Sequence, residues 1–254
     1  MKRHDGRRAN ETRPVRFERS FTKHAGGSVR VSFGNTQVLC TAMIEKDLPP
    51  WLKGKNAGAI AKGEKPQGWL TAEYAMLPSS TVTRKRRDTS KPDGRSVEIQ
   101  RLIGRALRAC LDLGQLHTPD GRDGLTLFVD CDVLQADGGT RTAAISGAWV
   151  AVRDAVAAAQ KSGLLSADSK VLTNQIAAIS VGLIGEKLTP VADLDYPEDV
   201  EAKVDMNVAM LDNGTFVEVQ GTGEHATFSQ DQLLAMLKLA AGAIKQLHKA
   251  QRAA

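Results

Sequence analysis

The stretch from Asp130 to Gly147 constrains the fold more than any other part of the sequence. It begins inside residues 125–134, which are rich in Leu, Val and Phe and are typical of a largely buried strand. It ends inside residues 142–159, an Ala- and Val-rich segment with little to interrupt a helix. Between the two lies the sequence Asp-Gly-Gly-Thr-Arg, residues 137–141, which predicts a tight turn from strand into helix.

This turn has the features of an anion site. Two adjacent glycines can adopt backbone conformations that other residues resist, so main-chain N–H groups can converge on one point. The helix N-terminus adds more N–H groups and a partial positive charge. We therefore predict that Gly139, Thr140 and Arg141 bind a phosphate-sized anion, with Arg95, in the first turn of a helix predicted over 94–112, as a second cation. A glycine turn capped by Thr also forms without any ligand, so both interpretations stay open.

Basic residues gather in one half of the chain. The whole sequence carries a formal net charge of +5 over 254 residues, with the composition of a soluble globular protein. The first thirty residues contain nine Lys or Arg against three acids, and a second cluster runs from Arg84 to Arg87. This asymmetry favours a polyanionic partner such as nucleic acid, although a run of like charges can also be a solvated loop.

The cysteines and the apolar runs indicate the compartment. Cys40, Cys110 and Cys131 are widely spaced and follow no metal-binding pattern, which predicts buried reduced thiols in a cytoplasmic protein. The basic N-terminus lacks an apolar core for export, and no run approaches the roughly 18 apolar residues that a membrane span needs. We expect no membrane association.

The pattern along the chain predicts an α+β fold of two strand-rich parts, each closed by helix. Expected strands or hairpin arms cover residues 15–21, 28–33, 36–44, 68–78, 176–184, 188–194, 204–211 and 216–220. A final helix over 230–248 is capped by Ser229, and residues 45–66 are expected to form a long loop. We place a soft boundary between residues 1–162, with the anion site and the basic loops, and residues 163–254, with the acids described next and the final helix, and expect one compact unit.

Six carboxylates crowd into thirteen positions: Asp193, Asp195, Glu198, Asp199, Glu201 and Asp205. Asp199 is predicted in a turn after Pro197, and Asp205 lies six residues later on the following strand. These two can converge on a hard cation such as Mg²⁺, which prefers oxygen ligands. Surface loops also collect acids, so a solvated cluster is the alternative.

Together these features suggest a reaction class. One site would hold an inorganic anion, a cation would polarise a phosphodiester, and the basic loops would hold a polyanionic chain. The sequence has no recognisable Ser/His/Asp or Cys/His arrangement. We therefore predict an enzyme that binds its nucleophile instead of supplying one.

Several long blocks carry a family signature. They are RPVRFE (Arg13–Glu18), GWLTAEYAMLP (Gly68–Pro78), GRSVEIQRLIGRALRA (Gly94–Ala109), DCDVLQADGGTRTAAISGA (Asp130–Ala148), DLDYPEDVEAKVDMNVAM (Asp193–Met210) and VEVQGTGE (Val217–Glu224). In this order, from about Arg7 to the final helix, the chain resembles the ribonuclease PH family. The resemblance implies a layered fold like the second domain of ribosomal protein S5, assembled as a homohexamer that is a trimer of dimers.

The resemblance also implies an activity: phosphorolytic 3′-to-5′ trimming of RNA, chiefly of tRNA precursors, with inorganic phosphate as co-substrate and nucleoside diphosphates as products. By resemblance, Arg95, Gly139, Thr140 and Arg141 bind that phosphate. Asp199 and Asp205 match the acids that bind the catalytic Mg²⁺. The N-terminal basic segment and the basic loop, with Arg84, Arg86 and Arg87, would line the RNA path. Because the step exchanges a phosphodiester for a diphosphate, we expect it to be reversible.

The chain departs from the family pattern at a few positions. Ser79 stands where many relatives have Arg or Gly, and Ala75 where Gly is usual, while residues 116–124 form a longer loop than the family suggests. The changes at Ser79 and Ala75 concern contacts along the RNA path, and the longer loop is expected to be a lineage-specific surface feature. Two alternatives to an enzyme are a catalytically inactive RNA-binding subunit of an exosome-like ring and a module for protein contacts. The presence of all four predicted site residues, Arg95, Arg141, Asp199 and Asp205, favours the enzyme.

Overall fold

The computed structural model describes residues 3–87 and 93–254, which form two β-sheets with helices packed against them. The five-stranded sheet has the order β1 (Val15–Arg19), β2 (Gly27–Phe33), β3 (Thr36–Glu45), β5 (Thr126–Gln135) and β4 (Trp69–Met76). Its neighbours are antiparallel except for β4 and β5, which run parallel. The predicted hairpin over 28–44 is confirmed, with Gly34 at φ 56° in its turn.

The second sheet has the order β7 (Thr189–Ala192), β6 (Ile176–Ile184), β8 (Val204–Leu211) and β9 (Phe216–Thr222), all antiparallel. Every residue of β6 is buried, as its unbroken apolar sequence predicts for a central strand. The β8–β9 hairpin is also confirmed. Its turn uses Gly214 at φ 90°, a conformation that glycine adopts without strain.

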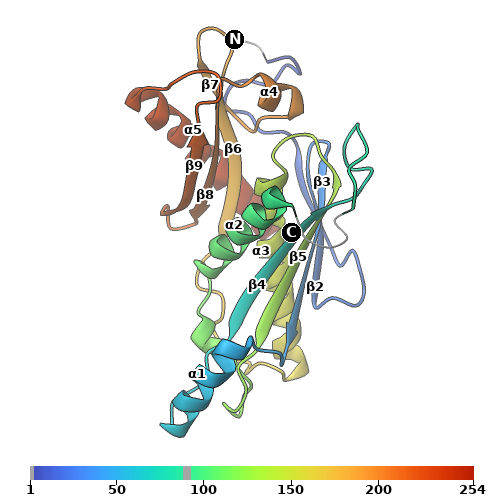
Figure 1. The fold of residues 1–254 in the computed structure, drawn as a ribbon, viewed down its shortest axis with the longest axis vertical. Helices are drawn as coiled ribbons and strands as arrows, with labels where there is room; N and C mark the ends of the chain where they lie inside the picture. Colours follow the sequence, from blue (N-terminus) through green and yellow to red (C-terminus); the bar gives the residue numbers. More distant parts are fainter. Residues whose placement is uncertain (1–2, 88–92) are drawn as a thin grey trace.

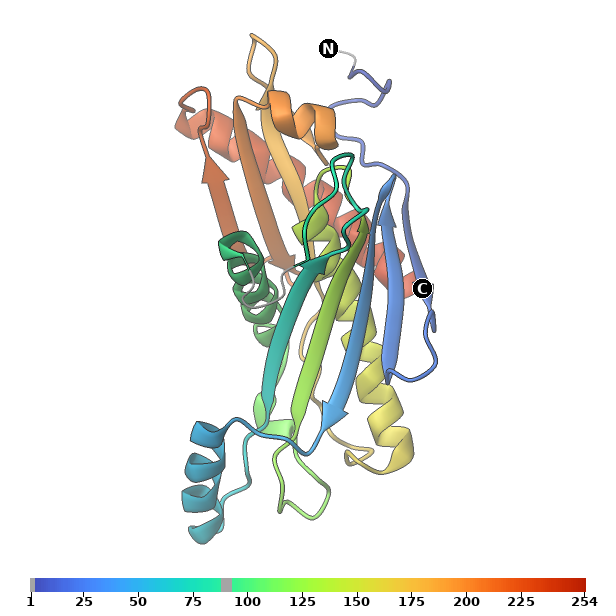
Figure 2. The same cartoon turned by 45° about the vertical axis from the view of Figure 1, so that its right-hand side comes forward.

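Four helices lie close to the two sheets: α2 (Gly94–Arg108), α3 (Thr140–Ser162), α4 (Tyr196–Glu201) and α5 (Gln230–Ala253). In Figure 2, α3 runs behind the five-stranded sheet and α5 behind the four-stranded one. Ser229 caps α5 as predicted, within a capping box formed with Gln232. The helix predicted to reach Asp112 ends at Arg108, because the N–H of Asp112 donates instead to the carbonyl of Val171 (2.8 Å).

The long helix α3 joins the two sheets. Most of its residues are buried, and glycines allow it to lie close against the five-stranded sheet. A Cβ on Gly27 of β2 would lie 1.8 Å from the carbonyl oxygen of Ala151, so a side chain there would separate helix and strand. On the other side, the N–H of Ala178 in β6 donates to Ser146 Oγ (3.0 Å). The first half of α3 is therefore fixed relative to both sheets.

The loop predicted over residues 45–66 is wrong, because helix α1 (Pro50–Ala61) occupies most of it. Pro50 suits the first helical turn, and Leu52 is fully buried. Asn56 is buried as well, and its side chain exchanges two hydrogen bonds with the backbone of Gln67 (2.8 and 3.1 Å). These long-range contacts stabilise a helix whose own sequence has little amphipathic character, and α1 projects from one end of the molecule (Figure 1).

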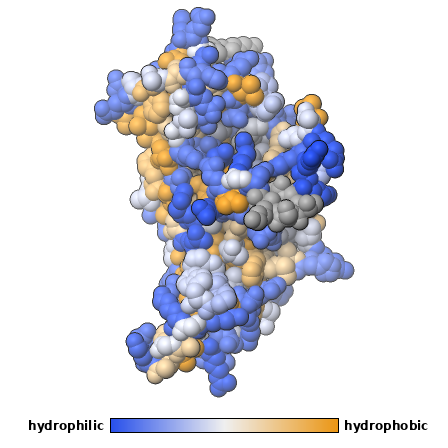
Figure 3. All heavy atoms as spheres, viewed as in Figure 1, coloured by the Kyte–Doolittle hydropathy of each residue, from blue (hydrophilic) through white to orange (hydrophobic). Residues whose placement is uncertain are grey.

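Among the described residues the larger hydrophobic core runs through both sheets and the helices packed against them, and a smaller cluster of Ile184, Val191, Leu194 and Ala202 lies apart from it. The division at residue 162/163 remains a prediction. Hydrophilic residues dominate the middle of the face in Figure 3, and apolar residues are scattered around them. Among the described helices, none is both long and apolar enough to cross a bilayer.

Candidate active site

Four elements bring the predicted site residues into one electrostatic environment. Burial raises the pKa of the Asp199 carboxyl in α4, and the charges of Arg95 and Arg141, in the first turns of α2 and α3, oppose that rise. Burial also raises the pKa of Asp205 on β8, with further increases from Asp199 and Glu224 and a decrease from Arg141. Two cations and two acids predicted from separate motifs therefore act on one another in the folded chain.

The glycine turn has the conformation that the sequence predicts. Gly138 and Gly139 are both left-handed, with φ of 73° and 67°. No side chain caps α3, and its first hydrogen bond runs from the N–H of Ala143 to the carbonyl of Gly139 (3.0 Å). The N–H groups of the first helical turn precede that bond and are not used by the helix. They are available to an anion, as the prediction requires.

Thr140 has a partner that the sequence did not reveal. The hydroxyl of Tyr74, buried on β4, donates a hydrogen bond to Thr140 Oγ1 (2.8 Å). Burial raises the pKa of Tyr74, so the phenol stays protonated and remains a donor. Because Thr140 Oγ1 accepts from Tyr74, its own proton is free to point toward an anion at the helix N-terminus.

Arg141 is held from two other elements. Its Nη1 donates to Gln220 Oε1 on β9 (3.3 Å) and lies 3.5 Å from Glu98 Oε1 on α2. Gln220 Nε2 also donates to Glu98 Oε1 (2.9 Å), which closes a triangle of side chains. Sequence reasoning missed Gln220 and Glu98, although both lie in the blocks that carry the family resemblance. They orient one edge of the guanidinium and reduce the freedom it would lose on binding an anion.

Five of the six crowded acids form two groups, and the sixth, Glu201, is exposed. Three of them accept ion pairs from arginines in residues 3–13. The pairs are Arg3 with Glu198, Arg7 with Asp195 and Arg13 with Asp193. The expectation that the N-terminal basic segment lines the RNA path is therefore wrong for these three arginines, which contact carboxylates of the same chain. Arg19 likewise pairs with Asp154 (2.7 Å).

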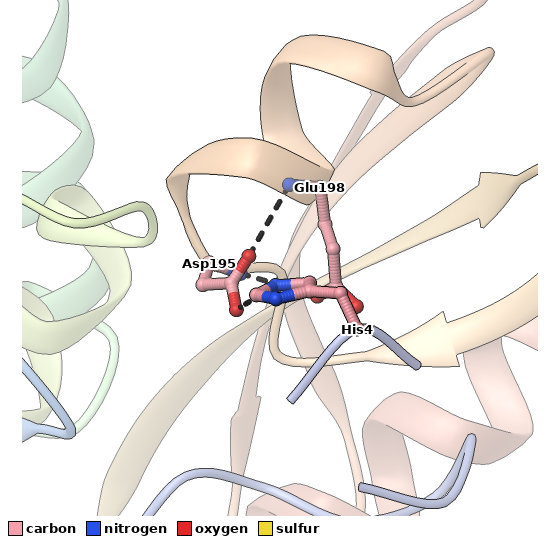
Figure 4. Close-up of side chains that lie close together, drawn as sticks. All are labelled: His4, Asp195 and Glu198. Carbon is pink, nitrogen blue, oxygen red and sulfur yellow. Dashed lines mark hydrogen bonds and ion pairs between the residues drawn. The ribbon is translucent and has the colours of Figure 1, made fainter. Parts of the chain in front are cut away.

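His4, Asp195 and Glu198 form a cluster that resembles a metal site by spacing, with ligand atoms within 4.8 Å of one another. Figure 4 shows the His4 ring beside Asp195, and His4 Nε2 lies 2.8 Å from Asp195 Oδ2. Glu198 already accepts hydrogen bonds from Arg3, and Asp195 caps α4 by accepting from the N–H of Glu198 (3.2 Å). These carboxylates are satisfied by protein donors, so the cluster fastens the N-terminal segment to α4.

Asp199 and Asp205 form the second group. Among the described residues neither side chain takes part in an ion pair, and Asp205 Oδ1 is buried without a hydrogen-bond partner, whereas Asp199 is exposed. An unpaired buried carboxylate oxygen is costly unless a cation or a proton satisfies it. Asp205 has such an oxygen, and together with Asp199, whose pKa is also raised, it offers oxygen ligands of the kind that Mg²⁺ prefers. Their surroundings therefore fit the predicted divalent cation.

The raised pKa values predict how the site responds to pH. A protonated carboxyl does not bind a cation, so catalysis should fall as the pH decreases through the raised pKa values, above the ordinary Asp value of about 3.9. Excess Mg²⁺ competes with the proton and should move this acid limb to lower pH. The check is a rate–pH profile at low and high Mg²⁺, and an acid limb that ignores Mg²⁺ would contradict the metal assignment.

The basic loop lies next to the site. Arg84, Arg86 and Arg87 are exposed in the segment that follows β4. Lys85 Nζ pairs with Asp93 Oδ2 (2.7 Å), and Asp93 caps α2 through the N–H of Ser96 (2.6 Å). This ion pair ties the loop to the helix end that carries Arg95. Ser79 and Ala75, the two departures from the family pattern, are also exposed.

Comparisons with known proteins identify relatives over nearly the whole chain. The 3′ exoribonuclease family matches with its domain 1 over residues 11–158 and with its domain 2 over residues 174–243. A protein named Ribonuclease PH from Synechococcus sp. (strain JA-2-3B'a(2-13)) is 51% identical over 254 residues, which cover 99% of this chain and 96% of that protein.

Solved structures have the same fold. Rice (Oryza sativa) Rrp46 gives a TM-score of 0.74 at 18% identity, over 98% of both chains. A chain of the Archaeoglobus fulgidus exosome with RNA bound to the active site gives 0.74 at 19% identity, over 98% of this chain and 92% of that one. At these identities the likeness concerns the fold alone, and it confirms the predicted ribonuclease PH-type α+β architecture.

Proposed function

This chain belongs to the ribonuclease PH family of 3′ exoribonucleases, and from that membership we propose that it shortens RNA from the 3′ end by phosphorolysis. The observation that carries the proposal is the pairing of two kinds of group at one site. An open helix N-terminus with Arg141 and Arg95 suits an inorganic anion, and Asp199 and Asp205 suit a cation. These groups bind a nucleophile and an electrophile but supply neither.

The cysteines support the same conclusion. Cys40, Cys110 and Cys131 are all buried and free. Burial raises the pKa of the Cys110 thiol to about 12, and it also raises the pKa of Cys131, so neither is a thiolate at neutral pH. The nucleophile in our proposal is inorganic phosphate, bound by Gly139, Thr140 and Arg141 together with Arg95.

In the proposed step, an oxygen of hydrogen phosphate attacks the phosphorus that joins the last nucleotide to the chain. The bond from that phosphorus to the preceding ribose O3′ breaks, and the proton of hydrogen phosphate balances the released hydroxyl. The products are a nucleoside diphosphate and an RNA one nucleotide shorter. Both reactants are anions, so Arg95 and Arg141 reduce their repulsion, and the glycine turn fixes the attacking phosphate. The step is reversible because one phosphoryl linkage is exchanged for another.

Asp199 and Asp205 would hold the Mg²⁺ ion in this proposal. When bound, the ion supplies positive charge beside the reacting phosphates. The two carboxylates would hold the ion, and the charge of Arg141 lowers the pKa of both.

The direct test uses a 3′-extended tRNA precursor incubated with and without inorganic phosphate. We expect nucleoside diphosphates only when phosphate is present, and a mature 3′ end as the long product. Release of nucleoside monophosphates in phosphate-free buffer would show hydrolysis by water and would refute the proposal. The reverse reaction, in which excess nucleoside diphosphate extends the RNA, is a second check.

The basic loop gives a prediction of its own. Replacing Arg84, Arg86 and Arg87 together by Gln should weaken RNA binding and lower the slope of log affinity against log salt by about two, because three phosphate contacts are lost. The measurement is RNA binding by fluorescence anisotropy over a salt series. As a control, the phosphate requirement should hardly change when the substrate is a dinucleotide, which is too short to contact this loop. An unaltered salt slope would remove this loop from the RNA path.

We further propose that the chain assembles as a homohexamer, a trimer of dimers, and acts in the cytoplasm. The family resemblance supports the assembly, and the three free cysteines favour a reducing compartment. Analytical sedimentation of the intact protein measures the number of subunits in the assembly. The alternative of a catalytically inactive ring subunit is disfavoured, because the relative named Ribonuclease PH is 51% identical, whereas Rrp46 and the exosome chain are below 20%.

A further inference from the structure

Arg13 lies between the two segments that carry the proposed site. One is the turn after β5, residues 136–139, which leads into Thr140 and Arg141. The other is the segment of residues 193–195, which leads into α4 and Asp199. Arg13 itself comes just before β1, and its side chain is only 6% exposed. A charged side chain so deeply buried is normally committed to fixed partners.

Its partners belong to both segments. Toward residues 193–195, Arg13 Nε donates to Asp193 Oδ2 (3.0 Å), Nη2 donates to Asp193 Oδ1 (2.7 Å), and the backbone N–H donates to Asp193 Oδ2 (2.6 Å). Toward the turn, Nη1 donates to the carbonyl of Asp137 and Nη2 to that of Gly138 (3.4 Å). One planar group thus contacts the backbone of the anion-binding turn and the carboxylate that precedes α4.

The backbone around these contacts is packed too closely to adjust freely. A Cβ on Gly138 would lie 2.6 Å from the carbonyl oxygen of Leu194, so the two segments meet backbone to backbone. Asp193 is fully buried and has φ 58°, a left-handed conformation that is unusual outside glycine. Such a conformation persists where the surrounding structure imposes it. Here the Arg13 guanidinium imposes it by donating two hydrogen bonds to the Asp193 carboxylate.

We propose that Arg13 and Asp193 are positioning residues that hold the phosphate-binding turn and the metal-binding acid at a fixed separation. Neither touches a reacting atom. Their effect is to keep Arg141, which follows the first segment, and Asp199, which follows the second, at a constant separation. This inference rests on the proposed phosphorolysis, because it assigns the two segments to one reaction.

The test compares three arginines that differ in what they join. Arg13 contacts both segments. Arg3 binds Glu198 of α4 through Nε (2.6 Å), and none of its contacts reaches the glycine turn. Arg19 makes a similar two-point contact with Asp154 (2.7 and 3.0 Å) on the far part of α3. The readouts are kcat, the apparent KM for phosphate and the apparent constant for Mg²⁺ on full-length protein.

For Arg13→Lys and for Asp193→Asn we expect both constants to rise by about tenfold or more, because the two halves lose their common alignment. The double variant should cost little more than the worse single variant, since the pair acts as a unit. Arg3→Lys should raise the Mg²⁺ constant more than the phosphate KM, and Arg19→Gln should leave both unchanged. A lower melting temperature with both constants unaltered in the Arg13 and Asp193 variants would reduce the pair to a role in folding and overturn the inference.

Two features keep the test decisive. Asn at position 193 keeps the volume of Asp and tolerates a left-handed backbone, so this variant should fold even if Arg13→Lys does not. Amide hydrogen exchange on the unmodified protein gives an independent measurement: inorganic phosphate should protect residues 193–195 as well as 138–141, and protection confined to 138–141 would contradict the coupling. If the unmodified enzyme releases no nucleoside diphosphates, the proposed function fails first and is recognised before any variant is made.

Discussion

Replacing Asp199 and Asp205 together by Asn should abolish the release of nucleoside diphosphates while leaving RNA binding nearly intact. Asp205 Oδ1 is buried without a partner, and in the proposed function this oxygen and the Asp199 carboxylate hold the cation. A bound Mg²⁺ contributes several kcal/mol of charge stabilisation in phosphoryl transfer, and each ~1.4 kcal/mol is a factor of ten. We therefore expect a fall in kcat of at least about 100-fold, measured as diphosphate released per enzyme.

The same variant should be no less stable than the unmodified protein at neutral pH. An acid with a raised pKa binds more protons in the folded chain than in the unfolded chain, so its contribution to stability falls as the pH rises through that range. Asn carries no charge and removes this cost. A melting temperature that is unchanged or higher would separate loss of catalysis from loss of fold.

Glu201→Gln provides the matched control, because Glu201 is an exposed acid of the same helix, two residues from Asp199. It should leave kcat and the Mg²⁺ requirement unchanged. Normal turnover by the Asp199 and Asp205 double variant, at any Mg²⁺ concentration, would show that the cation site is elsewhere.

The sequence predicts those parts of the fold that depend on local periodicity. The Gly34-Asn35 turn predicted the hairpin that contains β3, along most of which burial alternates, and an unbroken apolar run predicted β6, which is buried throughout. The glycine turn before α3 was predictable because Gly138 and Gly139 are residues that tolerate the left-handed backbone found there. Ser229 could be recognised as a cap because its partner Gln232 lies three residues away.

Features that depend on distant residues were not predictable in this way. Helix α1 has few helix-forming signals of its own. Its stability comes from contacts such as the hydrogen bond between Asn56 and Gln67 and the packing of the Trp51 ring against the Trp69 ring, whose centroids lie 5.0 Å apart. The N-terminal arginines were predicted to be available to RNA because their carboxylate partners lie about 180 to 195 positions further along the chain.

The supporting residues of the anion site were missed for the same reason. Tyr74 reaches Thr140 of α3 from β4, and Gln220 reaches Arg141 from the second sheet, so no spacing along the chain records either contact. The residues predicted for direct chemistry carry distinctive side chains within motifs. The residues that orient them are ordinary polar side chains whose role follows only from the folded geometry.

Arg141→Ala and Arg95→Ala should each raise the apparent KM for phosphate by about 10- to 150-fold, because each removes a charge-assisted contact worth about 1.5–3 kcal/mol. Arg141→Lys should fall between the native enzyme and Arg141→Ala, since it keeps the charge but loses the fork that Gln220 orients. The measurement is the rate of diphosphate release over a phosphate series at saturating RNA.

Arg101→Ala is the control for these two variants, because Arg101 is an exposed arginine of α2 outside the first turn that carries Arg95. It should not alter the phosphate requirement. RNA affinity in the absence of phosphate should also hardly change in Arg141→Ala, since the proposed site holds the attacking anion and not the polymer. If both Arg95→Ala and Arg141→Ala keep the native KM for phosphate, the N-terminus of α3 is not the phosphate site. The phosphate would then have to bind beside Asp199 and Asp205 through other residues.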